Sequence, residues 1–252
     1  MSLKQKIRNR ELTLGSWLTI PHISVVEIMA TAGFEWITID IEHAAIDIQS
    51  VQQLIAAIQG NGMKALVRVY KNDEVIIKRV LDAGADGVIV PMVNSKEDVM
   101  KVVESVYYPP KGKRGVGLSR AQQYGIGFEK YQKKLEKDII LIAQIEHVDA
   151  IRNLKDILSV EEIDGTIIGP YDLSASMGKP GKYHEEDVKE TIAKYDEICD
   201  AMQKPKGSHV ISSDSKETIQ KRELGYSFLA FSLDFFFLGD KAREEMAKIK
   251  GL

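Results

Sequence analysis

Seven polar side chains stand at or just beyond the ends of short apolar segments, where they could act together on one substrate. They are Asp40, Glu42, His43, Arg68, Gln144, Glu146 and Asp172. Burying carboxylates without partners is costly, because their charge loses its hydration. A metal ion, an arginine or a protonated histidine offsets that cost, and oxygen ligands without cysteine favour Mg²⁺, Mn²⁺ or a similar hard ion. We therefore expect a divalent metal held by carboxylates; the metal-free alternative is an ion-pair network of Arg68 with Glu146 and Asp172.

The sequence has five histidines, and one of them is placed for acid–base chemistry. His43 follows the segment that contains Asp40 and Glu42, which share a face because alternate residues of a strand point the same way. A histidine at such a position is a natural general base, since its pKa lies near neutrality. His209 lies near the end of another apolar segment and could line the same pocket, although no sequence feature decides it. The others, His22, His147 and His184, are interpreted as packing or surface residues.

Eight short β-branched or apolar segments alternate with longer segments of helical period. This alternation is typical of parallel strands joined by crossover helices. The predicted strands are 14–18, 36–41, 65–69, 87–91, 140–146, 165–169, 207–211 and 228–233. Eight such units favour an α/β fold of the closed (β/α)₈ TIM-barrel type, with the whole chain, 1–252, as a single domain. In this barrel the chemistry lies where strands end in loops, which is where the polar residues occur.

The predicted helices carry start and stop signals. Three glycines end helical segments and are followed within three residues by a strand: Gly33, Gly84 and Gly225. Two pairs have the spacing of a capping box: Ser24 with Glu27, and Ser95 with Asp98. These signals support a repeated order of helix, glycine stop and strand.

The connection between Pro91 and Ile140 is too long for a single crossover helix. A predicted helix over 95–106 is followed by a segment rich in glycine, proline and basic residues, and then by an amphipathic stretch near 128–137. Long loops on rigid barrels usually carry function. We therefore expect this insertion to cover the substrate; the alternative is a merely solvated loop.

Composition excludes several classes of protein. The chain has 34 lysines and arginines against 37 aspartates and glutamates, without a basic stripe, so a nucleic-acid partner is not expected. No segment is as long and apolar as a membrane-spanning helix, and the basic N-terminus leads into no apolar signal-peptide core. We therefore expect a cytoplasmic protein without a membrane partner. The single cysteine, Cys199, can form no internal disulfide and is interpreted as structural.

Six short motifs in register resemble the HpcH/HpaI aldolase family. They are D-x-E-H at 40–43, V-R at 67–68, V-P-M-V at 90–93, YPPKGKRGVG at 108–117, Q-x-E at 144–146 and IGPYDLSASMG at 168–178. Each motif alone is loose, but their order and spacing match over nearly the whole chain. The resemblance implies a class II, metal-dependent aldolase that reversibly cleaves a 4-hydroxy-2-oxo acid to pyruvate and an aldehyde.

The resemblance also implies roles for individual residues. Glu146 and Asp172 would ligate the metal, Mg²⁺, Mn²⁺ or Co²⁺, which stabilises the enolate of pyruvate left by cleavage. Arg68 would lie against the same 2-oxo oxygen, and His43 would take the proton from the C4 hydroxyl. Asp40 belongs to the same catalytic set.

Four further positions take roles from the same resemblance. Asp82 stands where the family has an aspartate that raises the basicity of the catalytic histidine; otherwise it is a residue of the last helical turn, where the helix dipole disfavours it. Gln144 would orient the pyruvate part or a metal-bound water. Backbone N–H groups around Tyr171 and Asp172 would receive the substrate carboxylate. Trp17 would line the aldehyde side, with packing in the barrel core as its alternative.

The resemblance implies an assembly as well. Family members form hexamers in which neighbouring chains complete the pocket, so we expect a homo-oligomer, either a hexamer or a trimer of dimers. The apolar C-terminal segment that starts at Asp234 is expected to be a helix exchanged between subunits. Two departures from the family leave the aldehyde open: the segment LSRAQQYG at 118–125, and Tyr171 in place of a smaller residue.

Two other functions stay open. One is a related lyase of the citrate-lyase β type or an oxaloacetate decarboxylase, which keeps the metal and the enolate; the Q-x-E and D-x-E-H motifs favour the aldolase over it. The other is a barrel that binds a 2-oxo acid without turnover. A pure binder has no need of a general base, so the presence of His43 speaks against it.

Overall fold

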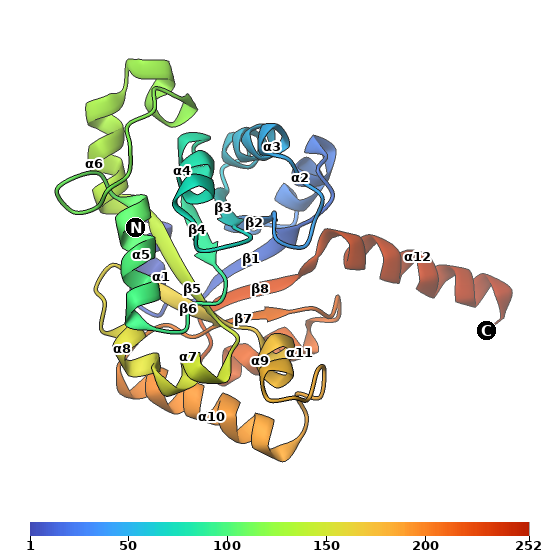
Figure 1. Cartoon of the computed structure of the whole chain (residues 1–252). Helices are drawn as coiled ribbons and strands as arrows, with labels where there is room; N and C mark the ends of the chain where they lie inside the picture. Colours follow the sequence, from blue (N-terminus) through green and yellow to red (C-terminus); the bar gives the residue numbers. More distant parts are fainter. Residues whose placement is uncertain (252) are drawn as a thin grey trace.

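The chain folds into a closed barrel of eight parallel strands, in the order β1 to β8 around the barrel (Figure 1). The structure is a computed structural model and describes residues 1–251. The strands are β1 (Thr13–Leu18), β2 (Trp36–Asp40), β3 (Lys64–Arg68), β4 (Gly87–Val90), β5 (Ile140–Ile145), β6 (Gly165–Ile168), β7 (Gly207–Val210) and β8 (Phe228–Leu233). Each predicted strand is found within one residue at either end. The predicted (β/α)₈ TIM barrel is therefore confirmed.

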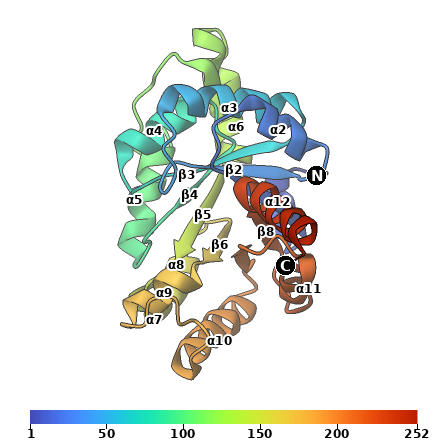
Figure 2. The ribbon, with the colours of Figure 1, turned by 90° about the vertical axis from the view of Figure 1, so that its right-hand side faces the viewer.

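Helices cover the outside of the barrel (Figures 1 and 2). They are α1 (Leu3–Arg8), α2 (Ile23–Ala30), α3 (Ile48–Gly60), α4 (Glu74–Asp82), α5 (Lys96–Val106), the 3₁₀ helix η1 (Arg120–Gly125), α6 (Phe128–Asp138), α7 (Val148–Arg152), α8 (Leu154–Leu158), α9 (Pro170–Ser176), α10 (Glu186–Ala201), α11 (Ser215–Glu223) and α12 (Asp234–Lys250). The last of them, α12, extends away from the barrel (Figure 1). Within residues 1–251, no helix has the length and apolar character needed to cross a membrane.

Both faces of the strands are buried, because alternate side chains point into the barrel and out toward the helices. The inward set includes Trp36, Leu66, Ile89, Ile142 and Phe228. At the N-terminal end of the barrel the rings of Trp36 and Phe228 stack, with 4.3 Å between their centroids. Gly15 is required beside them, since a Cβ at that position would lie 2.0 Å from the Trp36 ring. The cavity of the barrel lies at the C-terminal ends of the strands, here called the mouth.

The register between strands decides which side chains meet at the mouth. Asp40, the last residue of β2, is paired with Arg68, the last residue of β3. β5 and β6 are also neighbours. A Cβ added to Gly169, just after β6, would lie 3.1 Å from the Cβ of Glu146, just after β5. The polar residues at the ends of β2, β3, β5 and β6 are thus brought to one end of the barrel.

The signals for helix ends are confirmed in part. The three glycines have positive φ: Gly33 at 86°, Gly84 at 102° and Gly225 at 83°. Ser95 caps α5, since its hydroxyl accepts the N–H of Asp98 at 3.1 Å. The other predicted cap is wrong: α2 begins at Ile23, and Nδ1 of His22 accepts the N–H of Ser24 at 3.2 Å. The imidazole nitrogen of His22 caps the helix in place of the usual hydroxyl or carboxylate oxygen. A prediction based on the usual capping residues therefore does not find it.

The insertion between β4 and β5 packs beside α4, and α6 lies on the far side of the barrel from α12 (Figure 1). Arg114 holds it there, because its fully buried guanidinium donates to the carboxylate of Asp82 and, at 3.0 Å, to the phenol oxygen of Tyr131. Arg120 donates to the carbonyl oxygen of Ala83 at 3.0 Å. No residue of 107–138 lines the cavity at the mouth. The expectation that this insertion covers the substrate of its own barrel is therefore wrong.

The Arg114–Asp82 pair should be a main anchor of the insertion. Asp82→Asn is expected to destabilise the fold by about 2–4 kcal/mol, because the buried guanidinium loses its counter-charge. Glu104→Gln is the matched control, since Glu104 pairs with Lys113 in the same insertion but at the surface, and exposed pairs contribute about 0–1 kcal/mol. Chemical denaturation followed by circular dichroism measures both free energies of unfolding. An equal, small loss in the two variants would contradict this role.

Candidate active site

The mouth of the barrel holds a cavity of about 760 Å³. Seven residues that the sequence placed in the site line it: Trp17, Asp40, His43, Arg68, Gln144, Tyr171 and Asp172. They come from β1, β2 and the loop after it, β3, β5 and the segment after β6. A concave space of this size with several convergent polar groups can hold a small organic molecule.

Arg68 carries the positive charge of this site. Its Nε and Nη2 donate to the two carboxylate oxygens of Asp40, at 3.0 and 2.7 Å. Nε also lies 3.2 Å from Oε2 of Glu42. The guanidinium carbon is 4.3 Å from the centre of the Trp17 ring. Two parallel hydrogen bonds to one carboxylate fix the plane of the guanidinium, so Arg68 keeps one orientation at the mouth.

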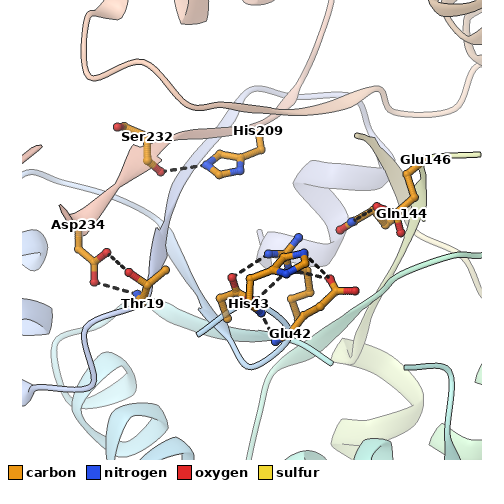
Figure 3. A network of polar contacts seen from close by, with 10 residues as sticks. Thr19, Glu42, His43, Gln144, Glu146, His209, Ser232 and Asp234 are labelled. Carbon is orange, nitrogen blue, oxygen red and sulfur yellow. Dashed lines mark hydrogen bonds and ion pairs between the residues drawn. The ribbon is translucent and has the colours of Figure 1, made fainter. Parts of the chain in front are cut away.

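Glu146 is almost fully buried, at 4% exposure. One of its oxygens, Oε1, accepts the backbone N–H of Met92 at 2.7 Å. The other, Oε2, accepts the side-chain amide of Gln144 (Figure 3). Burial raises the pKa of Glu146, and the negative charge of Asp172 raises it further. Glu146 follows β5 and Asp172 lies in the first turn of α9 after β6, and these two strands are neighbours, so both carboxylates belong to the same end of the barrel.

Glu42 is the second carboxylate of the site with a raised pKa. Burial raises this pKa to about 7, despite the opposing attraction of Arg68. Three other carboxylates raise it further: Glu146, Asp40 and Asp172. The buried Oε2 of Glu42 accepts no hydrogen bond. The mouth therefore holds more negative charge than its guanidinium neutralises.

His43 stands at the edge of the cavity, on the loop after β2. Its side chain is 66% exposed, and Nε2 lies 3.8 Å from Oε2 of Glu42 (Figure 3). The backbone N–H of His43 donates to Oδ1 of Asp40 at 3.3 Å, which ties the loop to the end of the strand. An imidazole that borders both solvent and the cavity can pass a proton between water and a bound molecule.

Tyr171 and Asp172 belong to the first turn of α9. Both residues line the cavity and both are exposed, so they can contact a bound molecule. The ring centroids of Tyr171 and Tyr183 are 5.0 Å apart. The segment after β6 thus brings one carboxylate and an aromatic wall to the cavity.

Asp82 is not brought to the cavity of its own chain. It is the last residue of α4, in the outer layer, where its carboxylate accepts from Arg114. α4 runs back from the mouth toward the start of β4, so its last residue lies away from the C-terminal ends of the strands. A role for Asp82 in catalysis therefore requires a second copy of the chain.

The donor set fits a divalent cation. Glu42, Glu146 and Asp172 repel one another, while Arg68 is already engaged by Asp40, so a dication would compensate the remaining charge. The predicted metal-free network is not formed: within 1–251, the ion-pair partners of Arg68 are Asp40 and Glu42. Among residues 1–251, no group of three or more histidine, cysteine, aspartate or glutamate side chains is arranged to hold a metal ion by itself. Glu146 and Asp172 would hold it as two ligands, with water and substrate completing the coordination.

The sequence left the role of His209 open, and the structure places it in the wall of the cavity. Its ring stacks on Trp17 with 4.9 Å between centroids. Nε2 lies 3.2 Å from the carbonyl oxygen of Ser232 (Figure 3). Burial lowers the pKa of His209 to about 3, so the ring is neutral at physiological pH. Strand alternation was the signal that could have found it, because His209 and Ile211 share a face and both line the cavity.

Comparison of the sequence with known proteins identifies related enzymes. Residues 13–238 match the family model described as HpcH/HpaI aldolase/citrate lyase. A hydroxypyruvate/pyruvate aldolase from Roseovarius nubinhibens is 34% identical over 249 residues, which cover 98% of this chain and 96% of that protein. A 2-keto-3-deoxy-L-rhamnonate aldolase from Escherichia coli K12 is also 34% identical over 249 residues, which cover 98% of this chain and 92% of that enzyme.

Comparison of the folds gives the same relationship. The crystal structure of an HpcH/HpaI aldolase from Desulfitobacterium hafniense DCB-2 superposes with a TM-score of 0.91 at 31% identity, covering 100% of this chain and 98% of that one. The sequence comparison and the fold comparison therefore agree. The chain belongs to the HpcH/HpaI aldolase/citrate lyase family of carbon–carbon lyases.

Proposed function

We propose that the protein is a class II aldolase that reversibly cleaves a 4-hydroxy-2-oxo acid to pyruvate and an aldehyde, with Mg²⁺, Mn²⁺ or Co²⁺ as its cofactor. The observation that carries the proposal is the carboxylate of Asp172 in the wall of the cavity, with Glu146 hydrogen-bonded to Gln144 of the same wall. The aldolases among its relatives support the same reaction.

The cleavage step needs positive charge at the 2-oxo group of the substrate. Glu146 and Asp172 would hold a divalent cation, which would supply Lewis-acid stabilisation of the negative charge that develops on the 2-oxo oxygen. Arg68 adds a fixed positive charge beside the same oxygen. Asp40 and Glu42 engage its Nε and Nη2, which leaves Nη1 to donate to the substrate. A guanidinium held in advance does not have to reorganise as charge develops.

His43 is the proposed general base. It takes the proton from the C4 hydroxyl during cleavage and returns it to the aldehyde oxygen during condensation. Glu42, with Oε2 at 3.8 Å from Nε2 of His43, stabilises the imidazolium that forms. The exposed side of the ring allows the proton to pass to water.

The remaining residues position the substrate. The amide nitrogen of Gln144 is engaged by Glu146, so its side chain has one orientation from which its oxygen can face the pyruvate part. Backbone N–H groups around Tyr171 and Asp172 receive the substrate carboxylate. Trp17, already beneath the guanidinium of Arg68, borders the aldehyde side.

A homo-oligomer, either a hexamer or a trimer of dimers, would complete this site. In a single chain Asp82 lies in the outer layer, so only a neighbouring subunit could bring an aspartate of this kind to His43. α12 extends from the barrel with apolar side chains exposed, including Leu238 at 68% and Ile249 at 77%. Exchange of this helix between subunits would cover them.

The direct test is exchange of the pyruvate methyl protons in D₂O, followed by proton NMR in the presence of Mg²⁺. We expect the methyl signal to decay, and a new aldol to appear when an aldehyde is added. Absence of both reactions with Mg²⁺, Mn²⁺ and Co²⁺ would refute the aldolase. Turnover of oxaloacetate or an acyl-CoA alone would instead favour a decarboxylase or a citrate-lyase-like enzyme. Pyruvate binding without exchange would favour a non-catalytic barrel.

Substitution of the metal ligands should weaken the metal site. Glu146→Gln and Asp172→Asn each remove one negative ligand, so we expect the affinity for Mn²⁺ to fall by about 10–100-fold or more. Calorimetric titration with Mn²⁺ measures this directly. Glu217→Gln is the control, because Glu217 lines the same cavity from α11 but lies outside the proposed ligand pair. If Asp172→Asn and Glu217→Gln bound Mn²⁺ equally well, the assignment of the ligands would fail.

Removal of the general base should affect turnover and leave metal binding intact. We expect His43→Ala to lower kcat for cleavage by about 10²–10⁴-fold, with an unchanged affinity for Mn²⁺. Steady-state kinetics and calorimetry on the same preparation separate the two effects. His22→Ala provides a matched histidine control, because His22 caps α2 away from the cavity lining. A kcat for His43→Ala within twofold of wild type would remove His43 from the mechanism.

A further inference from the structure

His209 lines the cavity, but the proposed reaction gives it no role. It belongs to β7, which stands between β6, leading to Asp172, and β8. The part of the wall contributed by β7, β8 and β1 also includes the apolar side chains of Trp17, Ile211 and Leu233. When a ligand fills the cavity and excludes water, a polar ring nitrogen in this wall loses a hydrogen bond unless the ligand supplies a partner.

The backbone of β8 decides which ring nitrogen of His209 carries the proton. Ser232 has a positive φ of 53°, and its carbonyl oxygen is 3.2 Å from Nε2 of His209. The same oxygen accepts the hydroxyl of Ser16 at 3.1 Å. A carbonyl oxygen only accepts, so Nε2 must carry the hydrogen and Nδ1 must be the unprotonated nitrogen with a free lone pair. The low pKa of the ring agrees with a neutral imidazole.

The lone pair of Nδ1 is open to the cavity. Among the described residues, the hydrogen bond of the His209 ring is the one from Nε2 to Ser232, and Nδ1 is not one of the buried polar atoms without a partner. Figure 3 shows the ring of His209 directed from its backbone toward Ser232. Stacking on Trp17 and the bond to Ser232 together hold the ring in this orientation.

We propose that Nδ1 of His209 accepts a hydrogen bond from a hydroxyl group of the substrate, so that the enzyme prefers hydroxylated substrates to their deoxy counterparts. This inference rests on the proposed aldolase function and names its substrate class. A neutral acceptor in an apolar wall selects a donor: a carboxylate or phosphate would place its own lone pairs against Nδ1, whereas a hydroxyl group donates to it. Such a site discriminates against the analogue that lacks the hydroxyl, because the acceptor is then left unpaired.

The hydroxyl can belong to either half of the aldol. It is carried by the aldehyde when a hydroxyaldehyde condenses with pyruvate, and by the nucleophile when a 3-hydroxy-2-oxo acid takes the place of pyruvate. Two matched pairs of substrates separate these sources. Glycolaldehyde and acetaldehyde, each with pyruvate, test the aldehyde; hydroxypyruvate and pyruvate, each with acetaldehyde, test the nucleophile.

Two substitutions of His209 distinguish the roles of its two ring nitrogens. The amide nitrogen of glutamine can replace Nε2–H and keep the bond to Ser232 while the Nδ1 acceptor is lost, so His209→Gln removes only the proposed function. The amide oxygen of asparagine occupies the position of Nδ1, so His209→Asn restores an acceptor. For each variant, kcat/KM is measured with the hydroxylated and the deoxy substrate of each pair. The ratio of the two values is compared between variants, which cancels the intrinsic reactivity of the substrates.

We expect the ratio to fall by about three- to tenfold in His209→Gln for one of the two pairs, as for the loss of one uncharged hydrogen bond, and to recover at least in part in His209→Asn. The pair that responds identifies the half of the aldol that carries the hydroxyl. Equal ratios in wild type and His209→Gln for both pairs would overturn the inference while leaving the aldolase intact. If wild type condensed none of the substrates, the proposed function itself would fail.

A measurement on the wild-type protein tests the same inference without relying on the folding of a variant. With ¹⁵N-labelled histidine and Mg²⁺, the resonance of the unprotonated Nδ1 of His209 should move upfield when the hydroxylated member of the responding pair binds. The deoxy member should leave it in place. Identical shifts with both members, or an Nδ1 that carries the proton in the free enzyme, would overturn the inference.

Discussion

The guanidinium of Arg68 lies among four carboxylates, and its pairing with one of them decides what the others can do. Asp40 accepts two hydrogen bonds from it, so most of its charge is compensated before any ligand arrives. Glu42, Glu146 and Asp172 then repel one another across the mouth, and burial adds to the cost, as the raised pKa values of Glu42 and Glu146 express. A barrel can maintain this imbalance because its large apolar core stabilises the fold elsewhere. This uncompensated charge is the feature of the mouth that supports the proposed cation site.

The barrel backbone holds these groups in place through ordinary strand pairing and two unusual residues. Parallel pairing sets Asp40 beside Arg68 without any contribution from loops. Met92 and Ser232 have positive φ values of 52° and 53°, a conformation that costs energy for residues other than glycine. In return, the N–H of Met92 points to Glu146, and the carbonyl oxygen of Ser232 points to His209. Both strained residues thus lie next to side chains of the mouth and orient them.

Much of the site could be predicted from the sequence because its causes are local. Alternation along a strand and the place where the strand ends are properties of a few consecutive residues, and Asp40 and Gln144 do line the cavity, with Glu146 hydrogen-bonded to Gln144 behind them. Contacts between residues far apart in the sequence could not be predicted from such local patterns. The position of the insertion depends on Arg114 reaching the end of α4 across 32 residues of sequence. Hydrogen bonds from backbone donors, such as the N–H of Met92, cannot be predicted from the types of the side chains.

The two carboxylate oxygens of Asp82 have different surroundings. Its Oδ1 accepts from Arg114, while Oδ2 lies beside Gly117, where a Cβ would be only 2.8 Å away. The glycine therefore leaves Oδ2 uncovered. Asp82 also borders an outer cavity of about 360 Å³ between α3, α4 and the insertion. If a neighbouring subunit presents its His43 at this surface, Oδ2 is the atom that would meet it, and the bond from Arg114 to Oδ1 would hold the carboxylate in the orientation required.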